Sequence, residues 1–154
     1  MRNFALILLF IASPAFAQDS QLVGSWKLVS YQLILDSDPP KDQLGKEPKG
    51  ELILTNDGRV ITILASDTRA PAKTDQERSE LFKSMIAYAG KYRIEGKEII
   101  TTVEVSWNEA WNGTDQRRLW RIEDGKLFIE SVPQPSTLFP GKTAVGRSVW
   151  ERRK

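Results

Sequence analysis

Glu104, Gln116 and Arg118 are polar side chains on two expected strands, and together they could act on a small molecule. Because side chains alternate between the two faces of a strand, Glu104 shares a face with Thr102, and Arg118 shares one with Gln116. If both faces point into the fold, an acid and a base meet there and can orient a polar head group. The simpler alternative is a cross-strand salt bridge on the outer wall, worth only about 0 to 1 kcal/mol.

Four aromatic side chains accompany this polar set. Trp107 and Trp111 flank a loop that follows an expected strand, so they could grip a ligand at a rim or cap the core. Tyr31 and Tyr88 carry hydroxyl groups that could donate a proton. The candidate ligand contacts are therefore Tyr31, Tyr88, Glu104, Trp107, Trp111, Gln116 and Arg118.

Acid–base catalysis is one possible use of these residues. Glu104 would be the acid or base and Tyr31 or Tyr88 the proton donor, in an isomerase, cyclase or hydratase acting on a hydrophobic substrate. Such chemistry needs a carboxylate whose pKa is raised by burial toward the working pH. Binding of a small apolar molecule without catalysis is the leading hypothesis, and a solid-cored interaction module is a third.

The chain contains no histidine and no cysteine. It therefore lacks an imidazole base, a thiolate nucleophile and the usual protein ligands of zinc, copper and iron centres. We expect no metal and no cofactor. Without disulfides, stability must come from core packing and sheet pairing.

The N-terminal residues have the three parts of a secretory signal peptide. Arg2 supplies a positive charge, residues 4–12 form a short apolar run, and residues 15–17 are an Ala-x-Ala cleavage site. The apolar run is too short for a membrane-spanning helix, which needs roughly 20 residues. We expect cleavage of residues 1–17, no membrane insertion, and one domain over residues 18–154, exported to the periplasm or secreted.

The remaining sequence alternates short β-branched and aromatic runs with turn signals, which is typical of a β protein. Asp57-Gly58 between two such runs is among the strongest hairpin signals. The expected strands cover residues 24–35, 51–55, 60–64, 91–95, 98–107, 114–122, 127–131 and 147–152.

One helix interrupts the strands. Thr74 precedes Glu77 by three residues, which predicts a capping box at the start of the helix. Leu81, Phe82, Met85 and Ile86 recur on one face, so we expect the helix to end near residues 88–90 and to pack that face on the barrel or cover one end of it.

Eight strands joined mostly by short turns favour an all-β, up-and-down antiparallel barrel. Pairing the last strand with the first would remove both exposed edges of an open sheet. A barrel of this strand number either fills its interior with side chains or leaves space for one small ligand.

A set of motifs occurs in order along the chain: residues 24–31 with Gly24-x-Trp26, residues 45–50, Asp57-Gly58-Arg59, residues 87–92, the run from Val103 to Arg118, and residues 149–152. This set resembles the motifs of the bacterial and fungal lipocalin-like domain family. The resemblance implies a calycin-type barrel, with Trp26 closing one end and Arg147 or Arg152 packing on it. Relatives by fold include binders of small apolar molecules and a few enzymes that act on isoprenoids.

The distribution of charged residues along the chain indicates which kinds of partner the protein can bind. Lys and Arg number 22 against 20 Asp and Glu, and both signs are interspersed along the chain. Because nucleic-acid binding proteins carry a basic stripe, we expect no nucleic-acid partner. The sequence leaves the oligomeric state open.

Overall fold

The structure of the chain is a computed structural model that describes residues 20–136 and 138–154. The expected signal peptide, residues 1–17, lies outside the described residues. Within the described ranges, no helix combines the length and the apolar character that crossing a membrane requires.

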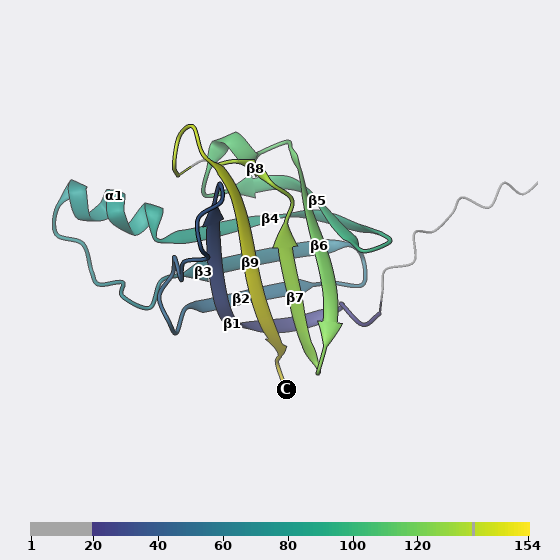
Figure 1. Cartoon of the computed structure of the whole chain (residues 1–154). Helices are drawn as coiled ribbons and strands as arrows, with labels where there is room; N and C mark the ends of the chain where they lie inside the picture. Colours follow the sequence, from purple (N-terminus) through teal and green to yellow (C-terminus); the bar gives the residue numbers. More distant parts are fainter. Residues whose placement is uncertain (1–19, 137) are drawn as a thin grey trace, which may run out of the picture.

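Eight long strands form one closed antiparallel barrel, which confirms the predicted fold class. Each pairs with the next along the chain, and β9 pairs with both β7 and β1. Figure 1 shows the yellow β9 between the green β7 and the dark blue β1. The strands are β1 (Gly24–Leu35), β2 (Lys49–Leu54), β3 (Arg59–Ala65), β4 (Met85–Glu95), β5 (Glu98–Ser106), β6 (Asp115–Glu123), β7 (Lys126–Ser131) and β9 (Thr143–Arg152). The two-residue β8 (Gln134–Pro135) pairs with the start of β9.

The two ends of the barrel differ in their connections. Short turns at residues 55–58, 96–97 and 124–125 join strands at one end, which we call the closed end. Four longer connections, residues 36–48, 66–84, 107–114 and 132–142, lie at the other end, which we call the open end. Long connections can shape an entrance, whereas short turns leave little beyond the sheet itself.

A bulge in β1 decides which of its residues face inward. Leu28 pairs with Trp150 but Ser30 pairs with Val149, so Val29 is an extra residue. Such an extra residue breaks the alternation of faces. Tyr31 therefore faces inward although it lies an odd number of residues after the buried Trp26.

The helix is shorter than the sequence pattern predicted. α1 (Asp75–Lys83) begins at Thr74 with the expected capping box, but β4 replaces its expected last turns. The reason is tertiary: Ile86 and Tyr88 pair with Leu64 and Thr62 of β3, and this pairing outweighs local helix propensity.

The apolar face expected for the helix packs on the barrel only in part. No residue of α1 is buried, and Phe82 is 48% exposed. Figure 1 shows α1 extending away from the barrel rather than covering an end. The helix therefore does not cover an end of the barrel, although its last turn touches the open end, where the ring centre of Phe82 lies 6.4 Å from that of Trp107.

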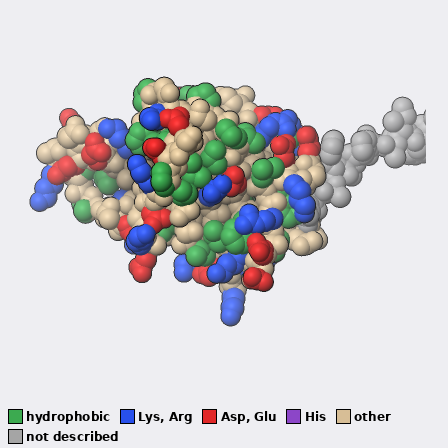
Figure 2. Space-filling view, viewed as in Figure 1, with side chains coloured by type: hydrophobic (Ala, Val, Ile, Leu, Met, Phe, Trp, Pro, Cys, Tyr) green, Lys and Arg blue, Asp and Glu red, His purple; other side chains and the backbone are tan. Residues whose placement is uncertain are grey.

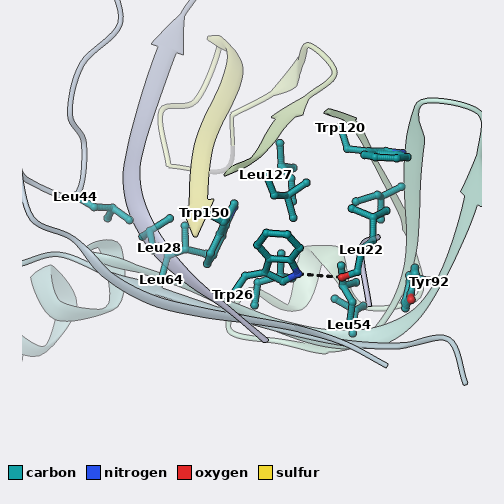
Figure 3. Close-up of a cluster of buried hydrophobic side chains, with 14 residues drawn as sticks. Leu22, Trp26, Leu28, Leu44, Leu54, Leu64, Tyr92, Trp120, Leu127 and Trp150 are labelled. Carbon is teal, nitrogen blue, oxygen red and sulfur yellow. Dashed lines mark hydrogen bonds between the residues drawn. The ribbon is translucent and has the colours of Figure 1, made fainter. Parts of the chain in front are cut away.

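The closed half of the barrel is filled by side chains. Leu22, Leu54, Leu127 and Trp150 surround Trp26, which is 1% exposed (Figure 3). Nε1 of Trp26 donates a hydrogen bond to the carbonyl oxygen of Leu22 at 2.9 Å. This half supplies a continuous apolar core.

Arg152, and not Arg147, packs on Trp26. Its guanidinium carbon lies 4.2 Å from the Trp26 ring centre, and it donates hydrogen bonds to the carbonyl oxygens of Gln21 and Val23. Arg147 instead donates a hydrogen bond to Glu130 on the outer wall. The choice that the sequence left open is thus decided.

The outer surface carries mixed charges. On the face shown in Figure 2, Lys and Arg side chains are interspersed with Asp and Glu. Many form exposed ion pairs such as Lys27 with Glu151. Such pairs favour solubility more than stability.

Candidate functional site

A cavity of about 110 Å³ lies in the open half of the barrel. Its aliphatic wall comes from alternate strand positions, including Leu33, Leu64, Ile86 and Ile129. Trp150 lines the cavity and also belongs to the core, so it marks where the filled half ends. An apolar cavity of about 150 Å³ holds one benzene molecule, so this space suits one small ligand.

Three aromatic side chains form a cluster on one side of the cavity. The ring centres of Trp107 and Trp111 are 4.9 Å apart with an interplanar angle of 85°. The ring centres of Tyr88 and Trp111 are 5.7 Å apart, and their planes meet at 63°. Edge-to-face contacts of this kind hold aromatic rings in defined orientations.

Trp111 is positioned by the 3-10 helix η1 (Glu109–Trp111). The side chain of Asn108 accepts a hydrogen bond from the backbone N–H of Ala110, which caps this single turn. The sequence predicted a loop here, and the turn brings both tryptophans to the cavity wall.

Arg118 projects from β6 toward this aromatic cluster. Its guanidinium carbon lies 5.1 Å from the Tyr88 ring centre and 5.5 Å from that of Trp111. No carboxylate of residues 20–136 or 138–154 lies within ion-pair distance of it. Nη1 of Arg118 is buried without a hydrogen-bond partner. The cavity wall therefore contains a positive charge that no acid of the described chain neutralises.

Tyr31 reaches the cavity from the opposite wall. Gly146 makes room for it, because a Cβ at position 146 would lie 2.7 Å from the Tyr31 hydroxyl oxygen. Burial raises the pKa of Tyr31 to about 12 from its ordinary value of 10.0, although the nearby Arg118 acts to lower it. The phenol is therefore neutral near pH 7 and can donate a hydrogen bond.

Glu104 does not enter the cavity. It is exposed on the outer wall and forms an ion pair with Arg59 at 2.7 Å. In β5 the inward positions include Ile99 and Val103, and Ile99 is the residue that pairs with Arg118. Glu104 and Arg118 therefore lie on opposite faces of the sheet, and both arrangements expected for this pair are wrong.

Gln116 shares the inner face with Arg118 as the period of two predicts, but it is not part of the cavity wall. It is buried, and its Nε2 donates a hydrogen bond to Oγ1 of Thr114 at 2.9 Å. The structure thus brings together five of the candidate ligand contacts. They are Tyr31, Tyr88, Trp107, Trp111 and Arg118.

Among the described residues, the cavity wall contains no acidic side chain, since none of those that line it is an aspartate or a glutamate. Catalysis through an interior Glu104, with Tyr31 or Tyr88 as donor, therefore lacks its carboxylate. Within the described part of the chain, no group of three acidic side chains is placed to hold a metal ion.

Sequence reasoning missed the small polar residues of the wall. Thr62, Ser131 and Ser148 are buried and line the cavity. Alternation in β3 could have indicated Thr62, because Val60 and Leu64 on the same face are core residues. The same alternation could have indicated the two serines, because Ser131 follows the core residue Ile129 by two positions and Ser148 precedes the core residue Trp150 by two.

Comparison with known protein families gives a match. A family model described as a lipocalin-like domain matches residues 23–153, which include all eight long strands. A search of curated proteins gives no match to the chain.

Proposed function

The chain belongs to the lipocalin-like domain family, and from that premise we propose that it binds and carries a small, mostly apolar molecule inside its barrel. The cavity in the open half is the observation that carries the proposal. In a barrel without a ligand site, side chains would fill the whole interior. In this barrel, aliphatic and aromatic side chains instead surround about 110 Å³ of unfilled space. Largely apolar concave sites with a few polar groups are typical of small-molecule binding.

Burial of apolar surface supplies the affinity. A ligand that loses about 200 Å² of apolar surface to the cavity gains about 5 kcal/mol before association costs. Association costs at least about 4 kcal/mol, so apolar contact alone gives weak binding. A polar contact within the cavity is needed for useful affinity.

The proposed place of action is outside the cytoplasm. The basic, apolar and Ala-x-Ala parts of residues 1–17 support export, to the periplasm or the medium. A carrier there would meet small molecules that the cell imports, releases or protects itself from.

Native mass spectrometry of the protein purified from its own host tests this proposal. We expect a complex with one bound small molecule, and a chain mass equal to that of residues 18–154. Protein that is bare in repeated preparations would argue against a carrier. A chain mass that still contains residues 1–17 would argue against export.

The variant Thr62→Phe tests whether the bound molecule occupies this cavity. Thr62 is 3% exposed, lines the cavity, and its Oγ1 has no hydrogen-bond partner. A phenyl ring there should occupy the ligand space without removing an existing interaction. The variant should keep the β circular-dichroism spectrum and lose most of the bound molecule. Undiminished ligand in a folded Thr62→Phe protein would place the binding site elsewhere.

A further inference from the structure

We propose that the molecule bound in the cavity carries one carboxylate, which pairs with Arg118. The ligand class is then a small aromatic or short-chain aliphatic monocarboxylic acid, with its apolar part against the aliphatic wall. This inference rests on the proposed function, because it specifies the chemistry of the same ligand.

The sign of the charge in the cavity is the first argument. Among the described residues that line it, only Arg118 and Lys83 are charged, and both are basic. The side chain of Lys83, at the end of α1, is 56% exposed and forms an ion pair with Glu80. Solvent and this carboxylate therefore already compensate its positive charge. Arg118 has no such partner, and a partly buried cation favours an anion beside it.

Unpartnered hydrogen-bond donors are the second argument. Three buried polar atoms that lack a partner belong to cavity-lining residues: Nη1 of Arg118, Nε1 of Trp107 and Oγ1 of Thr62. Each can donate a hydrogen bond, and buried donors in native proteins normally have acceptors. A carboxylate offers two oxygens with about four acceptor positions. A ligand with a single acceptor would leave more of these donors unsatisfied.

The position of the guanidinium is the third argument. Tyr88 and Trp111 both lie within cation–π distance of it. The ring centre of Trp107 lies 4.9 Å from that of Trp111, so the unpartnered Nε1 of Trp107 belongs to the same aromatic cluster. Arg118 is therefore held in place before a ligand arrives, which favours the planar, two-bond geometry of an arginine–carboxylate pair.

Size and charge select a monocarboxylate among anions. One unpaired cation matches one negative charge, whereas a phosphate monoester brings nearly two. The cavity of about 110 Å³ is smaller than one that holds a whole benzene molecule, but it is not fully enclosed, so a ring or short chain can fill it while part of the ligand extends into the opening.

The test compares benzoate with benzamide, its neutral analogue of nearly equal shape, by NMR titration of the full domain at pH 7. For the wild type we expect benzoate to bind about 10-fold more tightly or better, because a hydrogen-bonded charge is removed in the amide. Arg118→Met should bring the two affinities together. Arg118→Lys keeps the charge without the two-bond geometry and should retain part of the preference. Arg147→Met, on the outer wall, should leave the preference unchanged.

Two results would overturn the inference. Equal binding of benzoate and benzamide by the wild type would exclude a carboxylate preference, yet would leave the proposal of an apolar carrier intact. A benzoate preference that persists in folded Arg118→Met would assign the charge selection to another residue. If neither compound binds, the inference fails, and the mass spectrum of the host protein still decides the carrier proposal separately.

Discussion

Replacing Trp26 by alanine should lower the free energy of unfolding by about 3–5 kcal/mol, a large fraction of the roughly 5–15 kcal/mol of a typical domain. Trp26 is 1% exposed, fills the closed end of the barrel and has Arg152 against its ring. Its removal leaves a large void among side chains that are held by the closed sheet and cannot collapse freely. Urea unfolding followed by circular dichroism measures the change.

Trp26→Phe is the control for this prediction. It keeps an aromatic ring but removes the hydrogen bond from Nε1 to the Leu22 carbonyl oxygen. We expect about half the loss seen for alanine. If Trp26→Ala costs less than about 1 kcal/mol, Trp26 is not the anchor of the closed end.

Replacing Gly90 by alanine should cost about 3 kcal/mol or more. A Cβ at this position would lie 2.1 Å from the backbone carbonyl oxygen of Thr102 on the neighbouring strand. That atom belongs to a paired backbone, so it cannot move aside as a flexible side chain would. The β4–β5 pairing would have to open locally, which urea unfolding and amide exchange of β4 and β5 would detect.

Gly96→Ala provides the comparison. Gly96 lies in the β4–β5 turn at φ 59°, and nothing within 4 Å would meet an added Cβ. Its substitution carries only the backbone strain of the left-handed region, about 1–2 kcal/mol. A Gly90→Ala cost no larger than that of Gly96→Ala would contradict the close approach at the bulge.

Features that depend on neighbouring residues were predictable from the sequence. The bounds of β1, the Asp57-Gly58 hairpin and the Thr74–Glu77 capping box all follow from local backbone chemistry, and the structure has each of them. Closure of the barrel was predictable from the edge problem that an open sheet would have.

Features that depend on strand register were not predictable from the sequence. Val29 in β1 and Glu104 in β5 are extra residues at bulges, and the sequence carries no signal for either. The first turns Tyr31 inward. Near the second, Glu104 and Val105 are both exposed. A strict alternation of faces therefore fails at these two points.

The end of the helix and the partners of the charged residues were likewise decided by distant contacts. Met85 and Ile86 fit a helix or a strand locally, and pairing with β3 selects the strand. Arg59, and not Arg118, lies beside Glu104 because it projects from the same outer face. The unpaired state of Arg118 could be seen only in three dimensions.

The two halves of the barrel differ in how their interiors are filled. The closed half is filled by apolar side chains, while the open half contains a cavity with three buried, unpartnered polar atoms in its wall, each of which lowers stability. Local departures of this kind from good packing are expected at functional sites.

Xenon binding in crystals of refolded, ligand-free protein tests the central claim most directly, since xenon enters apolar cavities that side chains leave empty. We predict a xenon atom inside the open half of the barrel, among Leu64, Ile86 and Ile129. Crystals with no xenon inside the barrel, and with side chains occupying that space, would contradict the claim that the fold encloses a ligand site.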